Sequence, residues 1–474
     1  MKKFSLLILA FVSGVALAQK TKQDVFKSID SKRDQYVDVA HRIWEFAEVG
    51  YQEVKSSELL QETLTQAGFK VEKSVAGIPT AFIASYGSGK PVIAILAEFD
   101  ALPGFSQDAV PEVKPVAGRT AGHACGHHLF GTASSAAGIA VKDWMIANKR
   151  SGTIRVYGTP AEEGGSGKVY MVRDGLFNDV DIVLHWHPSS QNSATFGSSL
   201  ANKSGKFRFH GIASHAAGSP ERGRSALDAV EAMNNMVNMM REHVPQETRI
   251  HYVITRGGEA PNVVPAFAEV YYYVRHPEKD QVVSIWERVV KAAEGAALGT
   301  ETKMDFELTG GVYNILTNEE LSDAMDKNLR LVGGYTLDDK EKDFAEKIQK
   351  TLTTTPPKPE TTNSIIAYQS NNDKTGSTDV GDVSWVVPTA GLSVATWVPG
   401  TPAHSWQAVA AGGMSIGNKG MMVAAKTLAG TAIDLFSDPK LIEEAWKEFK
   451  ERRPVDFKYS ALVGDRKPAL DYRK

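Results

Sequence analysis

Three short apolar runs, each followed by side chains able to bind metal or move protons, constrain the fold of this chain most strongly. The runs cover residues 92–96, 153–157 and 181–184, and they lie between helical or turn-rich segments. Runs of this kind are typical of strands in a sheet that helices cover on both faces. Open α/β sheets place their binding sites at the carboxyl ends of such strands. We therefore expect the polar residues after these runs to meet in one site.

The pattern changes near residue 200, where a different kind of unit begins. Strands are expected at residues 206–210, 249–254 and 270–275, with a helix at residues 225–240 between the first two strands. These elements form an α+β unit of ordinary domain size. A chain of 474 residues is long enough to hold this unit as an insertion into a larger domain.

The predicted organisation has four parts. They are a signal peptide at 1–18, a catalytic metal-binding domain at 19–202 and 312–440, an inserted lid or dimerisation domain at 203–311, and a charged tail at 441–474 to which no role is assigned. The predicted fold class is α/β, with a mixed-sheet catalytic domain and an inserted α+β domain.

The N-terminus is typical of a secretory signal peptide. Lys2 and Lys3 precede an apolar run at residues 4–16, and a small-x-small exit ends at Ala18. We expect cleavage after Ala18 and export to the periplasm or the medium. The sequence has no later run of about 20 apolar residues, so we expect no membrane partner. The formal net charge of −3 makes a nucleic-acid partner unexpected.

The single cysteine of the chain, Cys125, lies among imidazoles. His123, His127 and His128 are within three residues of it. One cysteine cannot form an internal disulfide, so Cys125 is either a buried apolar residue or a working thiolate. Because thiolate and imidazole are ordinary ligands of zinc-like metals, the Cys-x-His spacing favours a metal site.

Further candidates follow the predicted strands and one later loop. Glu162 and Glu163 are adjacent, so one can bind metal while the other faces the substrate and moves protons. His185, His187 and His404 add imidazoles. A thiolate, one carboxylate and three imidazoles are enough for two metals that share one ligand and keep open positions for water. Asp100, after the first run, suits a carboxylate that orients a metal-binding histidine.

Several segments together resemble a known family. They are residues 98–104, 122–127, 158–168, 214–217, 376–385 and 400–406. Taken together in this order, they resemble the co-catalytic zinc exopeptidases of the aminoacylase, hippurate hydrolase and auxin-conjugate hydrolase branch. Within that branch, the resemblance is strongest to the p-aminobenzoyl-glutamate hydrolases. The resemblance covers almost the whole chain after the signal peptide.

The resemblance implies a role for each matching residue of the metal site. Cys125 would bridge two divalent cations, His127 and His187 would complete one site, and Glu163 and His404 would complete the other. Glu162 would be the general base on a metal-bound water. The choice of His187 over His185 rests on its spacing from Asp181, which fits this branch of the family. Zinc suits these ligands, and manganese or cobalt can replace it.

The resemblance also implies functional residues in the inserted domain. His215 would reach the site of a neighbouring subunit in a homodimer and stabilise an oxyanion. Asn262 and Arg275 would hold the substrate, since an arginine fork suits a free carboxylate; for Arg275 a structural salt bridge is an equal alternative. His128 stands where relatives often have Asp or Asn, so it could perturb the metal site.

The predicted function is metal-dependent hydrolysis of the amide bond of small N-acyl or N-aroyl amino acids, p-aminobenzoyl-glutamate-like, or of dipeptides. Two alternatives remain open at this point. One is a cysteine-dependent amide hydrolase that uses Cys125 with His127 or His123 as its base. The other is a non-catalytic metal- or ligand-binding protein with the same fold.

Overall fold

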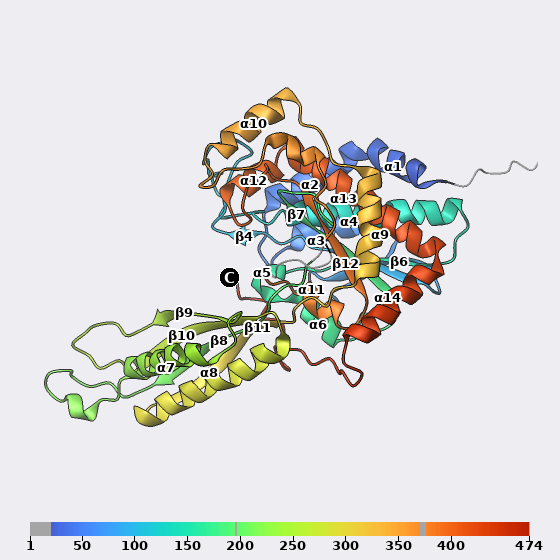
Figure 1. Cartoon of the computed structure of the whole chain (residues 1–474). Coiled ribbons are helices and arrows are strands. Elements are labelled where there is room, and N and C mark those ends of the chain that lie inside the picture. Colours follow the sequence, from blue (N-terminus) through green and yellow to red (C-terminus); the bar gives the residue numbers. More distant parts are fainter. Residues whose placement is uncertain (1–19, 195–196, 370–375, 474) are drawn as a thin grey trace, which may run out of the picture.

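The computed structural model describes residues 20–194, 197–369 and 376–473. The predicted signal peptide lies outside the described residues. The chain forms a large body and a smaller, elongated unit that extends from one side of it (Figure 1). None of the helices in the described part combines the length and apolarity needed to cross a bilayer.

The large body is built on a mixed six-stranded sheet. Its strand order is β1 (Lys70–Lys73), β2 (Phe82–Ser88), β6 (Gly152–Gly158), β3 (Val92–Ala97), β7 (Ile182–Ser189) and β12 (Thr389–Ala395). Strands β6, β3, β7 and β12 run parallel to one another, whereas β1 and β2 pair antiparallel. The carboxyl ends of the four parallel strands therefore lie at one edge of the sheet.

Both faces of this sheet are buried, as the continuous apolar runs predict. On β3, Ile93 and Ile95 belong to one core and Ala94 and Leu96 to the other, because side chains alternate along a strand. The first core includes the helices α1 (Lys22–Ser31), α2 (Arg33–Phe46), α3 (Val54–Gln66), α4 (His127–Ala147), α9 (Glu319–Val332) and α13 (Ser415–Ser437). The second includes α6 (Gly167–Arg173) and α11 (Val380–Ser384).

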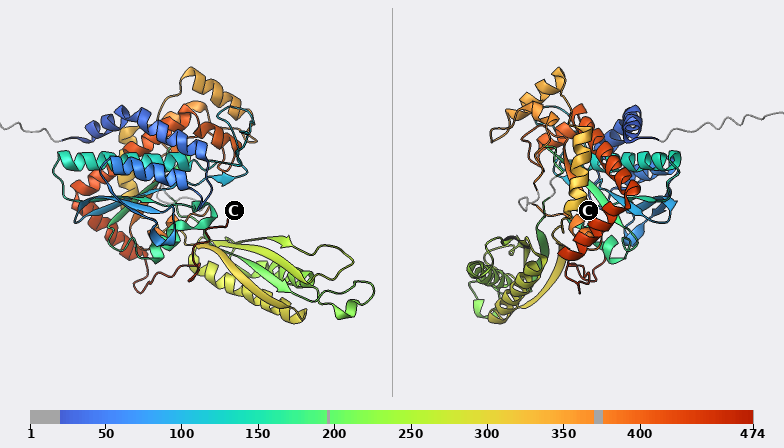
Figure 2. Two further views of the ribbon diagram at one scale, coloured as in Figure 1. Left: turned by 180° about the vertical axis from the view of Figure 1, so that it is seen from behind. Right: turned by 45° about the vertical axis from the view of Figure 1, so that its right-hand side comes forward.

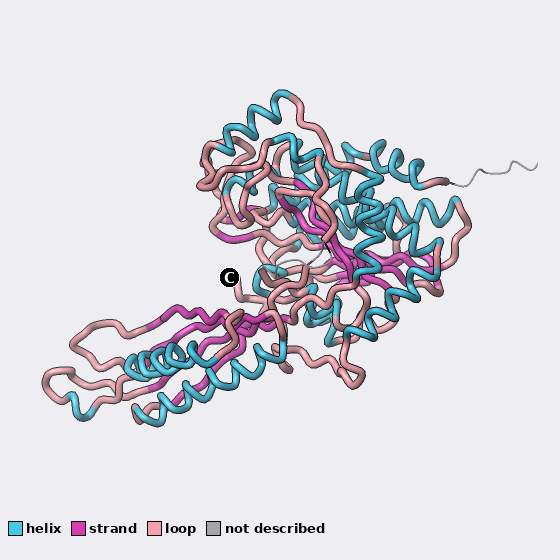
Figure 3. Tube along the Cα trace, in the orientation of Figure 1, coloured by secondary structure: helices cyan, strands magenta, loops and turns pink. Residues whose placement is uncertain are grey.

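The inserted unit is an antiparallel four-stranded sheet with two helices on one face (Figure 3). The strand order is β11 (Lys303–Val312), β8 (Ala201–His210), β10 (Phe267–His276) and β9 (Arg249–Arg256), and the helices are α7 (Ala226–Met240) and α8 (Lys279–Gly299). The chain enters through β8 and leaves through β11, which pair side by side. One two-stranded connection therefore carries the whole unit (Figure 2).

The remaining elements complete the body. They are β4 (Leu102–Pro103), β5 (Ala121–Gly122), α5 (Glu162–Gly165), α10 (Asp339–Gln349), α12 (Trp406–Gly412), α14 (Pro439–Arg452), and short 3-10 turns at Val75–Gly77 and Pro359–Asn363. The inserted unit has two further 3-10 turns, at Pro220–Arg222 and Arg241–His243.

The structure differs from the sequence-based expectations at two places in the body. Strand β7 extends to Ser189, so His185 and His187 lie within the strand rather than after it. The tail predicted from residue 441 begins inside α14, a helix that packs against α9 and α13.

Candidate metal centre

A cavity of about 930 Å³ lies where the carboxyl ends of the parallel strands face the inserted unit. Its body side carries Cys125, Glu163 and His404, and its other side carries Tyr273 and Arg275 of β10. Glu163 follows β6 and His404 follows β12, whereas Cys125 follows β5, which pairs with β4 outside the large sheet. The expectation that the polar residues after the apolar runs meet in one place agrees with this arrangement.

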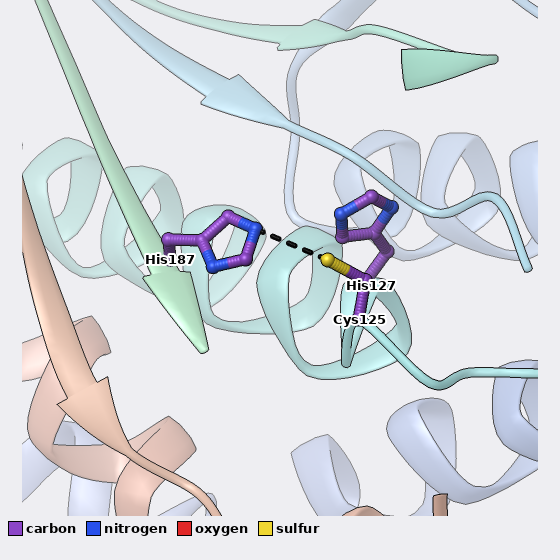
Figure 4. A group of neighbouring side chains, drawn as sticks. All are labelled: Cys125, His127 and His187. Carbon is purple, nitrogen blue, oxygen red and sulfur yellow. Dashed lines mark hydrogen bonds between the residues drawn. The ribbon is translucent and has the colours of Figure 1, made fainter. Parts of the chain in front are cut away.

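Cys125, His127 and His187 form the first group of possible metal ligands (Figure 4). The Cys125 Sγ and the His187 Nε2 are 3.4 Å apart, and the ligand atoms of the group all lie within 4.8 Å of one another. Gly126 caps α4 in the left-handed region, with φ +77°. A Cβ there would lie 2.7 Å from the Pro188 Cβ, so only glycine allows Cys125 and β7 to approach so closely.

Cys125, Glu163 and His404 form the second group, and Cys125 is common to both groups. The His404 Nε2 lies 3.0 Å from the Glu163 Oε1. His404 itself has a left-handed backbone with φ 55°, and its N–H donates to the Ala124 carbonyl at 3.0 Å. This hydrogen bond brings the loop after β12 next to the segment that carries Cys125.

The side chains present fit a pair of divalent cations. Within the described ranges, the His127 Nε2 and the Glu163 Oε1 are buried and make no well-aligned hydrogen bond, although they lie 3.1 Å from the Glu98 Oε2 and 3.0 Å from the His404 Nε2 respectively. Buried polar atoms are rarely left in this state unless an ion or ligand satisfies them. Burial would lower the pKa of His127, but Cys125, Asp100 and Glu98 outweigh it and raise this pKa well above its usual value. The site therefore has an excess of negative groups that a cation would balance.

Asp100 contacts one residue of each group. Its Oδ1 lies 2.8 Å from the His127 Nδ1, and its Oδ2 accepts a hydrogen bond from the Glu163 backbone N–H at 2.9 Å. A carboxylate on Nδ1 leaves the Nε2 of His127 as the ligand atom and fixes the orientation of the ring. Asp100 therefore orients a candidate ligand in both groups.

Glu162 and Glu163 lie on a short, strained turn. The flanking residues Ala161 and Ser166 have positive φ angles of 57° and 58°, and Glu163 is itself non-helical. Strain of this kind is stored at functional sites when the surroundings hold it in place. Glu163 belongs to one of the two groups that share Cys125, whereas Glu162 lines the cavity and belongs to a third candidate group, with Glu98 and His127.

The two adjacent glutamates have opposite electrostatic environments. Burial, together with the carboxylates of Glu163 and Glu98, raises the pKa of Glu162 well above its usual value. For Glu163, burial also acts to raise the pKa, but the imidazoles of His404 and His127 outweigh it and lower this pKa. One carboxyl group is thus suited to accept a proton and the other to remain an anionic ligand.

The sequence did not reveal a buried ion network beneath the site. Lys168, at the start of α6, places its Nζ 2.6 Å from the Glu98 Oε1 and 2.7 Å from the Asp379 Oδ1. The Glu98 Oε2 in turn lies 3.1 Å from the His127 Nε2. Glu98, Lys168 and Asp379 all lie in the segments that resemble the family. The position of Glu98, two residues before Asp100, was the one sequence feature that could have indicated this network.

Three of the histidines considered as candidates from the sequence, His123, His128 and His185, lie outside the ligand groups. The rings of His123 and His128 are buried, with their Nε2 atoms 3.0 Å from the carbonyls of Ile43 and Gly412 respectively. His185 packs against Gly391 of β12. His123 therefore does not serve Cys125 as a base, and burial raises the pKa of the Cys125 thiol. Both observations argue against the cysteine-hydrolase alternative, which needs a thiolate at neutral pH.

The predicted residues of the inserted unit occupy different places. Arg275 lines the cavity and donates to the Ser377 hydroxyl at 3.3 Å, and no carboxylate of the described residues forms an ion pair with it. The salt-bridge alternative for Arg275 is therefore not supported. His215 and Asn262 are exposed and do not line the cavity of their own chain. The His215 Nδ1 accepts a hydrogen bond from the Gly218 N–H at 2.9 Å.

Comparison with known proteins places this geometry in a family. Residues 201–301 match the peptidase dimerisation domain. The chain is 43% identical over 460 residues to one of the subunits of p-aminobenzoyl-glutamate hydrolase from Escherichia coli, covering 90% of this chain and 95% of that protein. It is 29% identical over 453 residues to the Xaa-Arg dipeptidase of Mus musculus, covering 92% and 94%.

Solved structures share the fold at lower identity. A dinuclear metal-binding peptidase of the M20 family from Bacillus subtilis has a TM-score of 0.59 at 16% identity, covering 86% of this chain and 99% of that chain. An aminobenzoyl-glutamate utilization protein from Klebsiella pneumoniae also has a TM-score of 0.59, at 18% identity, covering 88% and 98%.

Proposed function

The chain belongs to the M20 family of peptidases and amidohydrolases, and from this premise we propose that it hydrolyses the amide bond of small N-acyl or N-aroyl amino acids or dipeptides. We further propose that Cys125, His127 and His187 hold one divalent cation, and that Cys125, Glu163 and His404 hold a second. The observation that carries this proposal is the sharing of Cys125 by two ligand groups, with Glu162 outside both of these groups on the wall of the cavity.

When bound, the two cations supply Lewis-acid polarisation of the scissile carbonyl and lower the pKa of the attacking water. The residues of the chain account for the proton transfers. Glu162, whose pKa is raised, takes the proton from the attacking water and passes it to the leaving amine. Asp100 keeps His127 and the Glu163 backbone in place throughout.

The experiment that tests this function combines turnover with metal analysis. Purified protein is assayed on a panel of N-acyl amino acids, N-aroyl amino acids and dipeptides, and its metal content is measured on the same sample. We expect a chelator to abolish turnover and an added cation to restore it, with zinc as the resident metal and manganese or cobalt able to replace it. Turnover that is indifferent to chelators would contradict the proposal.

Arg275 is the proposed anchor for the free carboxylate of the substrate. It lies on the wall of the cavity contributed by the inserted unit, and its guanidinium is also 5.3 Å from the ring of Tyr273. The ring and the Ser377 hydroxyl hold the guanidinium without neutralising its charge. A cationic group in this state suits a carboxylate better than a neutral amide.

Arg275→Met should raise KM for N-acyl amino acids by roughly 10- to 100-fold, because a hydrogen bond to a charged group contributes about 1.5–3 kcal/mol. Steady-state kinetics checks this expectation. The same variant should change little for substrates whose free carboxylate is replaced by a carboxamide. Lys303→Met, which removes a positive charge from exposed β11 of the same sheet, is the control. An equal loss on both substrate types would contradict the assignment.

We also propose that the protein is a homodimer formed through the inserted unit. Strand β9 lies at the edge of its sheet and exposes Val253 and Ile254. An apolar edge strand is a template for pairing with another chain. In such a dimer, His215 would reach the site of the second copy, where it would stabilise the oxyanion of the transition state.

Subunit complementation tests this arrangement. Glu162→Gln and His215→Ala are each expected to be nearly inactive as homodimers, with the loss for His215→Ala about 10²- to 10³-fold. A heterodimer of the two variants, isolated with two affinity tags, should regain about half of the wild-type activity, because one of its two sites receives both intact residues. If His215 serves its own chain, the heterodimer stays inactive.

Export is proposed from residues 1–18 alone. The proposal predicts that the mature protein begins at Gln19. N-terminal sequencing of protein recovered from the periplasm or the medium tests it, and recovery of the uncleaved chain from the cytoplasm would contradict it.

A further inference from the structure

The last residues of the chain return to the candidate metal centre. The sequence marked residues 441–474 only as a charged tail, but in the structure the segment after α14 runs along the body and ends beside α5 (Figure 1). Its apolar residues Ala461, Leu462 and Val463 are buried. The segment is therefore a packed part of the body, and its contacts can be followed in order.

The first part of the segment fastens to the connection that carries the inserted unit. Leu462 packs against Gly311 of β11. The Arg466 guanidinium donates to the Thr309 carbonyl at 2.6 Å and lies 3.3 Å from the Glu307 Oε1, both on β11. Arg173 of α6 donates to the Arg466 carbonyl at 2.6 Å, which ties the same point to the body.

The second part contacts the turn that carries both glutamates. The Tyr472 hydroxyl donates to the Glu163 carbonyl at 2.9 Å, and the Arg473 guanidinium donates to the same oxygen at 2.8 Å. The Tyr472 ring stacks edge-on against Tyr51, with centroids 5.6 Å apart. A side chain at Gly50 would overlap the Tyr472 hydroxyl, so the body is shaped to receive it.

These two donors act on a strained backbone. The turn has left-handed residues at Ala161, Gly164 and Ser166, and Glu163 between them is non-helical. Strain of this kind persists only when surrounding contacts hold it in place. The Ala161 N–H, bonded to Glu53, and the Gly165 carbonyl, bonded to Tyr51, hold the two ends of the turn. Tyr472 and Arg473 hold its centre.

We propose that Tyr472 and Arg473 are positioning residues, which fix the Glu163 carbonyl so that Glu163 faces the metal centre while Glu162 faces the substrate. The inference rests on the proposed function. Arg473 also lines the cavity, and its Nε is buried with no hydrogen-bond partner among the described residues. The Arg466 contacts with β11 link the same segment to the connection that carries the inserted unit.

The test uses a double variant of the full-length protein, Tyr472→Phe with Arg473→Met, which removes both donors and keeps the packing of the ring. We expect kcat to fall about 10- to 100-fold, the loss typical of a small misplacement of catalytic groups. KM should change less than about twofold, because both donors bond to the Glu163 carbonyl and the proposed anchor for the substrate carboxylate is Arg275. Arg473→Lys, which keeps a donor, should recover part of the loss.

The matched control is Tyr459→Phe. Tyr459 lies in the same segment and donates to the Asp382 Oδ1 at 2.7 Å, away from the catalytic turn. Its loss should lower the thermal midpoint and leave kcat within about twofold of wild type. Equal reductions of kcat in the control and in the double variant would show that the segment acts only through stability, and would overturn the proposal.

Cobalt titration separates this proposal from the proposed function, since it needs no substrate. The double variant should bind Co²⁺ roughly 10-fold more weakly than wild type in chelator competition, with an altered visible spectrum, because the Glu163 ligand is no longer held. If the wild-type protein binds cobalt but hydrolyses no amide, the proposed function is wrong, and the difference in cobalt affinity between wild type and double variant still tests the role of Tyr472 and Arg473. A double variant that binds cobalt as tightly as wild type would overturn that role.

Discussion

Glu162→Gln should lower kcat by about 10²- to 10⁴-fold, the range that general-base catalysis contributes. The amide is nearly isosteric with the carboxylate but cannot accept the proton of the attacking water. Because Glu162 lines the cavity outside both groups that share Cys125, the variant should keep its full metal content. Steady-state kinetics and metal analysis on the same sample check both parts of the expectation.

The neighbouring glutamate provides the matched control. Glu163→Gln makes the same chemical change one residue along the same turn, but there it removes a metal ligand. It should lose the cation of the second group together with activity, and a high concentration of cation should restore part of the turnover. If Glu162→Gln retained full turnover, or if both variants lost metal equally, Glu162 would not be the general base.

Cys125→Ala should abolish turnover by removing the one ligand that both groups share. The affinity for both cations should fall by more than about 100-fold, since changes in residues that merely orient ligands already cost 10- to 100-fold. Single-ligand variants such as His187→Ala and His404→Ala should each weaken mainly one cation. Chelator competition, with metal counted per chain, measures the difference.

Thiol reactivity gives a second view of the same prediction. Cys125 is the only cysteine in the sequence, so a thiol reagent reports on this side chain alone. We expect the metal-free protein to react and the metal-loaded protein to be protected. A cysteine-dependent hydrolase would behave differently: alkylation would destroy activity whether or not metal was present, and chelators would leave turnover unchanged.

The features of the site that could be predicted from sequence are those attached to strands. The apolar runs that became β3, β6 and β7 fix where Asp100, Glu162 and the histidines of β7 must lie, because parallel strands end at one edge. The inserted unit was recognisable from its change of pattern. Strands β8 and β10 extend further than expected, since their pairing continues past the most apolar residues, and strand β11 and helix α8 were not predicted.

Other features depend on contacts that leave no periodic pattern. His185 and His187 are two residues apart and share a face of β7, so the alternation of side chains along the strand cannot show which of them is the ligand. The structure distinguishes them, because only His187 lies in a ligand group with Cys125. The role of Lys168 could not be predicted, because its two carboxylate partners, Glu98 and Asp379, are far from it in the sequence and contact it only in the folded core. The C-terminal segment docks through isolated contacts of Arg466, Tyr472 and Arg473, which no local pattern predicts.

The proposed function depends most on the sharing of Cys125 by two cations. Anomalous diffraction from crystals of the zinc-loaded protein, measured at the zinc absorption edge, tests it most directly. We predict two peaks in each chain, both within metal–sulfur bonding distance of the Cys125 Sγ, about 2.3 Å. A single peak, or two peaks of which one lies away from Cys125, would contradict the account.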